Sequence, residues 1–267
     1  VVFAAGVTTH IEANTANLAY TIRHNSGSED CLTIFTVVLL SSRSVTIPAT
    51  KMGDSRMKIA IIGGGPAGLM AAETAVAGGA QVELYDAMAS VGRKFLLAGK
   101  GGLNLTHSEP LDTFLTRYGS RRAQLTPTIR SFGPGEVREW AQRLGITTFV
   151  GTSGRIFPTD LKAAPLLRAW LRRLRKAGVQ FHVRHRWCGW DGQGQLQFST
   201  PQGTRSILAD AVVLALGGGS WPKLGSDAAW IPILEERRVP VKPLQPANCG
   251  FDVKWTDHFR TKFAGHP

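Results

Sequence analysis

Apolar and polar residues alternate with different periods along the chain, and the first clear pattern is a strand–helix–strand unit. The short apolar run Lys58–Ile62 is typical of a parallel strand that is buried on both faces. An Ala-rich helix is predicted over Ala67–Val76 and a second strand over Gln81–Tyr85, with a glycine pair between them. This order predicts an α/β fold built on a parallel sheet.

Two amphipathic helices are predicted from apolar residues that recur every three or four positions. They cover Gly135–Leu144 and Lys162–Lys176, and the second has an arginine-rich face opposite its apolar stripe. Residues 110–134 are interpreted as helix and loop, and Gly154–Asp160 as a turn.

The next segments predict a three-stranded antiparallel β-meander. Its strands are expected at Val179–Trp187, Gln195–Thr200 and Thr204–Leu208, because glycine-containing turns separate them. Ala211–Leu216 is a continuous apolar run and predicts another buried parallel strand, ending in three glycines at the ligand-binding edge of the sheet.

His182 and His185 lie in the first predicted strand of this meander. Their odd spacing is expected to direct them to opposite faces, which disfavours a shared metal ion. We predict no metal site.

The chain is expected to consist of three regions. Residues 1–56 show no persistent period and are interpreted as a poorly ordered extension that precedes an authentic start at Met57. A signal peptide is the weaker alternative, because the apolar stretch Cys31–Leu40 follows two acidic residues. A Rossmann-like domain is expected over 57–239, and residues 240–267 are expected to begin an inserted β-rich substrate domain. The last residues read as mid-domain sequence, so a fragment is expected.

Composition limits the class of protein. The 267 residues are 43% hydrophobic and 19% charged, as in an ordinary globular protein, and no apolar run reaches the roughly 18 residues of a membrane span. Cys31, Cys188 and Cys249 form no C-x-x-C pair, which fits a reducing cytoplasm. The net charge of +12 is compatible with nucleic acid, but a solvated basic helix face is the favoured interpretation.

The turn after the first strand carries the motif G-x-G-x-x-G at Gly63, Gly65 and Gly68. Glycine suits a tight turn, a close approach to pyrophosphate and close helix packing, and Pro66 suits the first helical turn. Asp86 ends the second strand, where such folds place the acid that binds ribose hydroxyls. The unit therefore predicts dinucleotide binding, and the acid argues against the 2′-phosphate of NADP.

Glycines and cations gather directly after this unit, between residues 90 and 106. They suit a loop that wraps an anionic ligand, since backbone donors and positive charge occur together. An ordinary flexible basic loop is the alternative.

The order of these segments resembles flavoproteins of the glutathione-reductase-like superfamily, which have two dinucleotide-binding domains. More narrowly, it is similar to bacterial FAD-binding enzymes of the aminoacetone oxidase family, relatives of bile-acid 3-dehydro reductases. The resemblance covers about residue 57 to residue 267 and rests on the segments Gly63–Gly68, Gly92–Lys94, Gly99–Thr106, Gly154–Pro158 and Leu214–Gly218.

The resemblance implies that FAD is the cofactor and that the protein is an oxidoreductase, transferring a hydride at the flavin. It implies that the FAD-contacting residues are Gly63, Gly65, Pro66, Ala67, Gly68, Asp86, Arg93, Lys94, Gly101, Gly102, Asn104, Leu105, Thr106, Trp187, Gly217 and Gly218. Among these, Arg93 and Lys94 would lie near the phosphates, and Trp187 near the adenine.

Two departures from the family restrict the prediction. Many relatives have Arg-Cys before Asn-Leu-Thr where this chain has Gly102-Leu103, so their substrates are not carried over. The family also continues past residue 267 to a last FAD-contacting segment, so weakened FAD retention is expected.

The catalytic residues and the substrate stay open, because no His/Asp or paired-carboxylate set stands out. Lys100, Asn104 and His107 are candidates only by proximity to the expected flavin loop. We expect a small-molecule substrate, with NAD(P)H as a possible electron donor, and neither a membrane nor a nucleic-acid partner. The alternatives are an FAD-dependent tRNA-modifying enzyme and a non-catalytic nucleotide-binding fragment.

Overall fold

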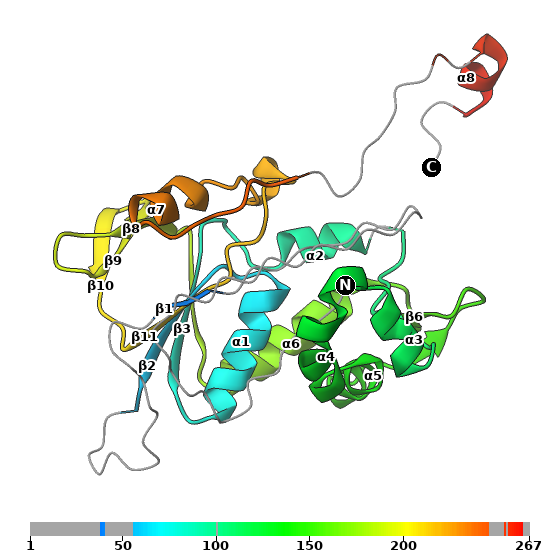
Figure 1. The fold of residues 1–267 in the computed structure, drawn as a ribbon, viewed down its shortest axis with the longest axis horizontal. Helices are drawn as coiled ribbons and strands as arrows, with labels where there is room; N and C mark the ends of the chain where they lie inside the picture. The colour runs from blue at the N-terminus through cyan, green and yellow to red at the C-terminus, as the bar shows by residue number, and fades with distance from the viewer. Residues whose placement is uncertain (1–37, 41–55, 100, 246–253, 255, 264–267) are drawn as a thin grey trace.

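A five-stranded sheet forms the centre of the computed structural model, which describes residues 38–40, 56–99, 101–245, 254 and 256–263 (Figure 1). The strand order is β1-β11-β2-β3-β7. The strands are β1 (Val38–Leu40), β2 (Lys58–Ile62), β3 (Gln81–Asp86), β7 (Gln180–Val183) and β11 (Ala211–Leu214). The pairs β11·β2, β2·β3 and β3·β7 are parallel, and β1 is antiparallel to β11.

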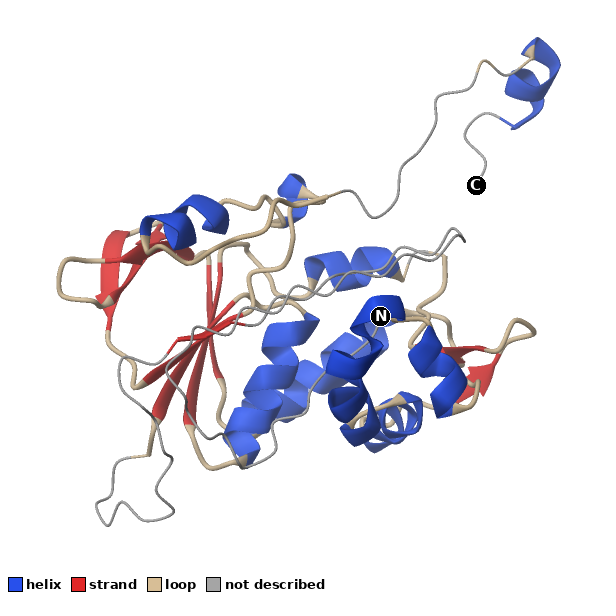
Figure 2. Ribbon diagram, in the orientation of Figure 1, coloured by secondary structure: helices blue, strands red, loops and turns tan. Residues whose placement is uncertain are grey.

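Helices cover one face of this sheet (Figure 2). They are α1 (Pro66–Ala77) and α6 (Ala163–Lys176), and their buried Leu69 and Trp170 join one apolar cluster with Ile61 of β2 and Leu84 of β3. The period of two along each strand directs these residues to the helices.

A β-meander and a helix cover the opposite face. The meander consists of β8 (Arg186–Trp190), β9 (Leu196–Thr200) and β10 (Gly203–Ile207), and the helix is α7 (Trp230–Glu236). Ile62 and Tyr85 of the central sheet are buried here in one cluster with Phe198 of β9. Burial on both faces explains why the parallel strands are continuous apolar runs, since each large side chain contributes roughly 1.5–3 kcal/mol when buried.

A smaller lobe contains most of the residues between β3 and α6. Its sheet has the order β4-β6-β5, and short helices pack beside it. The elements from residue 93 to residue 158 are α2 (Arg93–Ala98), β4 (Thr106–His107), α3 (Leu111–Thr116), η1 (Gly119–Arg121), α4 (Arg122–Ser131), α5 (Pro134–Arg143), β5 (Thr148–Val150) and β6 (Arg155–Pro158). Later in the chain come η2 (Pro222–Leu224) and α8 (Asp257–Phe263).

A carboxylate ties the lobe to the helical layer. Glu73 on α1 accepts hydrogen bonds from the indole N–H of Trp140 on α5 at 3.1 Å and of Trp170 on α6 at 2.6 Å. Its second oxygen forms an ion pair of 2.8 Å with Arg173. The two indoles meet edge to face, with ring centroids 4.7 Å apart. One acidic side chain therefore joins three helices.

Most of the predicted elements are confirmed: the strands of the strand–helix–strand unit, its helix, the two amphipathic helices, the last parallel strand and the existence of a meander. The predicted single strand Val179–Trp187 is wrong. Arg184 has φ = 57°, so the chain turns there; β7 joins the parallel sheet and β8 begins the meander.

This turn also overturns the expectation for the two histidines. His182 and His185 lie on the same side, with ring centroids 5.5 Å apart, because the strand alternation ends between them. Both rings contact Tyr85, at centroid distances of 4.6 Å and 5.8 Å.

Three other segments differ from prediction. Within the predicted turn Gly154–Asp160, Arg155–Pro158 form the central strand β6, because β4 and β5 both pair with it. Within the predicted anion-binding loop, Arg93–Ala98 form helix α2. Within the predicted disordered extension, Val38–Leu40 form the edge strand β1, and the rest of residues 1–55 lie outside the described part.

The predicted β-rich domain over 240–267 falls largely outside the described residues. Residues 240–245 form neither helix nor strand, and the helix α8 lies further on. The domain boundaries therefore stay a prediction.

Candidate functional site: a groove at the glycine-rich turn

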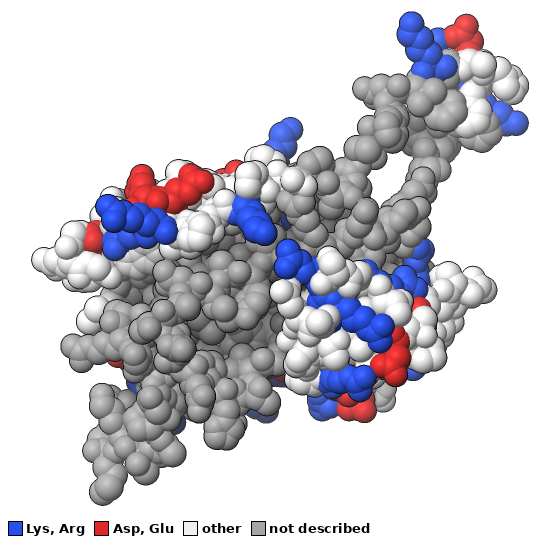
Figure 3. Space-filling view, in the orientation of Figure 1, with Lys and Arg blue, Asp and Glu red and all other residues white. Residues whose placement is uncertain are grey.

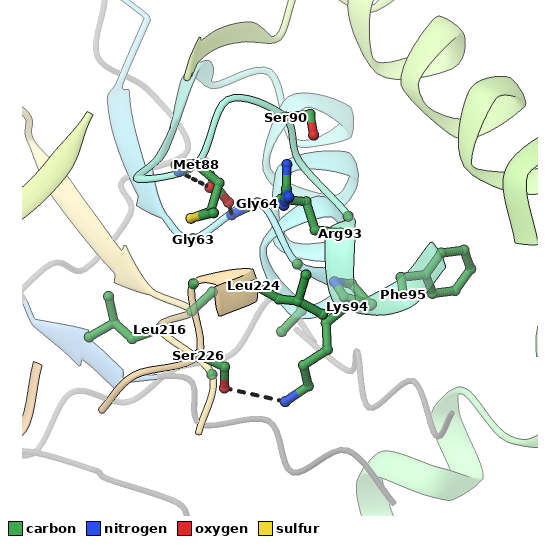
Figure 4. Close-up of a pocket in the computed structure, with 18 of the residues that line it drawn as sticks. Gly63, Gly64, Met88, Ser90, Arg93, Lys94, Phe95, Leu216, Leu224 and Ser226 are labelled. Carbon is green, nitrogen blue, oxygen red and sulfur yellow. Dashed lines mark hydrogen bonds between the residues drawn. The ribbon is translucent and has the colours of Figure 1, made fainter. Parts of the chain in front are cut away.

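The glycine-rich turn lies at the carboxyl ends of β2, β3 and β11, between β2 and α1 (Figure 4). Gly63 has φ = 109°, and a Cβ there would lie 2.2 Å from the carbonyl oxygen of Ala215. A Cβ on Gly68 would lie 1.8 Å from the carbonyl oxygen of Gly63. The first and third glycines of the motif are therefore required by the protein's own packing.

The middle glycine differs from these two. A Cβ on Gly65 would meet no atom of the described residues within 4 Å, and its φ of −78° is open to any residue. Gly65 is also the N-cap of α1, and no side chain of the described residues caps the helix there. The first N–H groups of a helix lack intrahelical partners and attract anions. The turn thus leaves space and donors for a bound group, which fits the pyrophosphate of a dinucleotide.

Asp86 fixes this turn from the end of β3. One carboxylate oxygen accepts a hydrogen bond from Gly64 N–H at 2.7 Å, and the other accepts one from Met88 N–H at 2.7 Å. Burial raises the pKa of the carboxyl group, and the two backbone donors together with Arg93 and Arg186 oppose that rise. A carboxylate has about four lone-pair sites, so two amide donors do not saturate it.

Gly64 is a site residue that the sequence prediction missed. Its N–H binds Asp86, and its carbonyl oxygen accepts from Gly92 N–H at 2.8 Å. A Cβ there would lie 2.3 Å from Cγ1 of Val91. The unbroken run of three glycines was the available signal, because the motif leaves the middle position, Gly64, free.

Two cations of α2 reach the groove (Figure 4). Gly92 precedes the helix with φ = 70°, and the Nε of Arg93 is buried and has no hydrogen-bond partner among the described residues. Lys94 Nζ donates to the hydroxyl oxygens of Ser220 at 2.9 Å and Ser226 at 3.3 Å. Both cations therefore line the wall of the groove, and the glycine-rich turn forms its floor. Positive charge beside backbone N–H donors suits the binding of an anion.

Half of the predicted site residues line the groove. They are Gly63, Gly65, Pro66, Ala67, Asp86, Arg93, Lys94 and Gly217. The groove residues that the sequence prediction missed include Gly64, Met88, Ser90, Gly92, Leu216, Leu224, Gly225 and Ser226. Several of these belong to the segment after β11, whose approach to α2 depends on the tertiary fold.

The other predicted site residues lie elsewhere. They are Gly68, Gly101, Gly102, Asn104, Leu105, Thr106, Trp187 and Gly218, none of which lines this groove. Gly68 packs beneath the turn, Leu105 is fully buried, and Trp187 is 7% exposed within the meander cluster. Their roles toward a flavin or an adenine stay predictions.

Of the residues considered as catalytic candidates, His107 is held by its neighbours. Its Nδ1 accepts from Glu109 N–H at 3.2 Å, so Nε2 carries the proton toward the Ser153 carbonyl oxygen, 3.0 Å away. Lys100 lies outside the described residues. The catalytic residues stay open.

Charges are interspersed on the smaller lobe rather than of one sign (Figure 3). Ion pairs join Arg130 to Asp112 at 3.0 Å and Arg143 to Glu139 at 3.6 Å. In the part of the chain that the structure describes, no helix is long and apolar enough to cross a bilayer, and no three His, Cys, Asp or Glu side chains form a metal-binding group.

The sequence is similar to known proteins. Residues 57–258 match the family described as the HI0933-like protein Rossmann domain, which leaves residues 1–56 outside, as the resemblance in sequence did. The chain is 31% identical over 201 residues to the 3-dehydro-bile acid delta(4,6)-reductase of Clostridium scindens. That match covers 74% of this chain and 48% of the relative, so the chain spans about half the relative's length.

Solved structures are similar to parts of the chain at low identity. The 3-ketosteroid-delta4-(5alpha)-dehydrogenase from Rhodococcus jostii RHA1 has 15% identity and a TM-score of 0.47, over 70% of this chain and 55% of that one. A flavocytochrome c3 fumarate reductase in an open conformation has 16% identity and a TM-score of 0.48, over 62% of this chain and 34% of that one.

Proposed function

The chain belongs to the HI0933-like Rossmann-domain family, and on that premise we propose that it is the FAD-binding part of a flavin-dependent oxidoreductase. The observation that carries the proposal is the space above Gly65. The uncapped start of α1 borders that space, and the cations Arg93 and Lys94 line the same groove.

Each groove residue has a role in holding the cofactor. The N–H groups at the start of α1 bind the pyrophosphate, and Arg93 and Lys94 add positive charge beside it. Asp86 accepts a hydrogen bond from a ribose hydroxyl through lone pairs that the Gly64 and Met88 amides leave open. FAD supplies hydride transfer when it is bound, and the protein supplies binding and orientation.

The reaction partners belong to the proposal as well. A small molecule is the substrate, since the Clostridium scindens relative is named as a reductase of a 3-dehydro-bile acid. NAD(P)H is the proposed electron donor and the cytoplasm the proposed location. Residues Gly101, Gly102, Asn104, Leu105 and Thr106 are proposed to face the flavin, Trp187 the adenine, and Gly217 and Gly218 the middle of the cofactor.

The test is the visible absorbance spectrum of the purified chain before and after incubation with FAD and desalting. A flavin spectrum that travels with the protein, and that bleaches on reduction with dithionite, is the expected result. If the chain and a version extended to the length of its relative are both colourless, the FAD proposal is rejected. A bound flavin that never turns over with any reductant would indicate a nucleotide-binding protein without catalysis.

A further inference from the structure

We propose that Ser226, assisted by Ser220, is a positioning residue that holds the Lys94 ammonium in place for the phosphates of the bound dinucleotide. This inference rests on the proposed function and adds two residues to the anion-binding side of the groove. Both serines lie in the segment after β11, far in sequence from α2.

The hydroxyl of Ser226 is a buried link with two partners. Ser226 is 6% exposed, and its oxygen accepts from Lys94 Nζ at 3.3 Å while its O–H donates to the Gly218 carbonyl at 2.7 Å. Ser220 is exposed and accepts from the same ammonium at 2.9 Å. Figure 4 shows the Lys94 side chain directed from α2 toward Ser226.

The backbone around Ser226 is built to keep this hydroxyl in one place. Trp221 and Ser226 exchange two backbone hydrogen bonds, of 3.0 Å and 3.1 Å, which close the η2 segment into a tight loop. Gly225 has φ = 87°, and a Cβ there would lie 2.8 Å from Cγ of Met88. Glycine therefore lets the loop approach the residue that follows β3.

Two hydroxyls suit a lysine that must bind an anion. They are neutral, so these two hydrogen bonds orient the ammonium without compensating its charge, as a carboxylate would. A lysine loses much rotamer freedom when it is ordered, and a side chain that is ordered before binding loses less on binding. Asp86 is the one acidic side chain among the described residues that line the groove, and it is bound by backbone amides.

The experiment measures the affinity of the full chain for ADP and for FAD by calorimetry, in wild type, Ser226→Ala, Lys94→Met and the double variant. We expect Ser226→Ala to weaken ADP binding about three- to tenfold. We expect the double variant to bind no more weakly than Lys94→Met alone, because the serine acts through the lysine. Ser199→Ala, at an exposed position of strand β9, and Lys176→Met, at the end of α6, are the matched controls and should bind as wild type.

A second measurement needs no ligand. The Lys94 amine should react faster with an amine-directed acylating reagent in Ser226→Ala than in wild type, as read by mass spectrometry, while Lys176 reacts equally in both. Ser220→Ala is the variant to use if Ser226→Ala does not fold, because Ser220 is exposed.

The outcomes separate the two proposals. If wild type binds neither ADP nor FAD, and the version extended to the length of its relative binds neither as well, the proposed function is rejected, and with it the phosphate role of Lys94. Wild type that binds both, with unchanged affinity and unchanged Lys94 labelling in the serine variants, rejects the positioning role alone. Fully additive losses in the double variant also reject it.

Discussion

The carboxylate of Asp86 accepts a hydrogen bond of 2.7 Å from the backbone N–H of Gly64. The acid expected to bind ribose therefore also holds the glycine-rich turn against the end of β3. Since its other oxygen accepts from Met88 N–H, one side chain fixes both the turn before α1 and the segment that leads to α2.

Replacing Asp86 tests this double role. Asp86→Asn keeps one acceptor oxygen and loses the other, so one buried amide donor loses its partner. We expect a loss of about 1–3 kcal/mol in the free energy of unfolding, measured by urea denaturation. Asp112→Asn, at an exposed site that pairs with Arg130, should change stability by less than about 1 kcal/mol. An Asp86→Asn protein as stable as wild type would contradict the claim that Asp86 holds the glycine-rich turn and the segment that leads to α2.

Substitutions at Gly65 and Gly68 of the turn should affect cofactor binding and protein stability differently. In Gly65→Ala the added methyl group meets no atom within 4 Å in the part of the chain that the structure describes, so the free energy of unfolding should stay within about 1 kcal/mol of wild type. The same methyl group would occupy the space that the pyrophosphate needs, so FAD binding should weaken at least tenfold, a loss of about 1.4 kcal/mol. Equilibrium titration with FAD measures it, and unchanged affinity would refute the assignment of that space.

Gly68→Ala should behave in the opposite way. Its methyl group would lie 1.8 Å from the Gly63 carbonyl oxygen, so the helix must move away from the strand. We expect a destabilisation of at least about 3 kcal/mol in thermal or urea unfolding. A stable Gly68→Ala protein would show that α1 is less closely packed than described.

The carboxylate of Glu73 should contribute strongly to the stability of the helical layer. Glu73→Ala leaves two indole N–H groups and Arg173 without their acceptor, and we expect a loss of about 2–3 kcal/mol in urea denaturation. Glu73→Gln is the matched variant. Its carbonyl oxygen can still accept from both indoles, so the loss should stay near 1 kcal/mol or less. Equal losses in the two variants would exclude the indole bonds as the cause.

His182 should make the fold sensitive to mild acid. Burial lowers the pKa of His182 below its usual 6.5, against the opposing effect of the Glu83 carboxylate 3.3 Å away, with His185 and Arg205 adding to the lowering. A base whose pKa is lowered on folding contributes stability that is fully present above pH 6.5. That stability is lost as the pH falls through the lower folded value.

The free energy of unfolding should therefore fall in wild type as the pH is lowered below 6.5 and through the lowered pKa of His182. The fall should be smaller in His182→Phe, which keeps a ring against Tyr85. Urea denaturation at several pH values measures this slope, with the exposed His258→Gln as control. An identical slope in wild type and His182→Phe would place the acid sensitivity elsewhere.

The local sequence was sufficient to predict the helices and strands in which the period of the apolar residues matches the faces that the fold buries. The run Lys58–Ile62 is apolar on both faces because the sheet is covered by α1 and α6 on one side and by the meander on the other. The stripe on Lys162–Lys176 predicted a helix that begins within one residue of α6. The glycines of the turn likewise predicted both the local conformation and the class of ligand.

Tertiary contacts decided the strand bounds and pairings that no local sequence pattern indicates. Arg184 adopts φ = 57° where its N–H binds the Met88 carbonyl, so one predicted strand became two in different sheets. Arg155–Pro158 became a strand because β4 and β5 pair with it.

The groove also combines a part that the local sequence determines and a part that tertiary contacts decide. The sequence by itself determined its floor, since the glycine motif, the helix start and Asp86 lie within one strand–helix–strand unit. Only the tertiary structure brought Ser226, 132 positions from Lys94, within 3.3 Å of that lysine's ammonium. The physical reason is that the floor depends on backbone conformation between neighbouring residues, whereas the wall depends on how a distant loop packs after the sheet has formed.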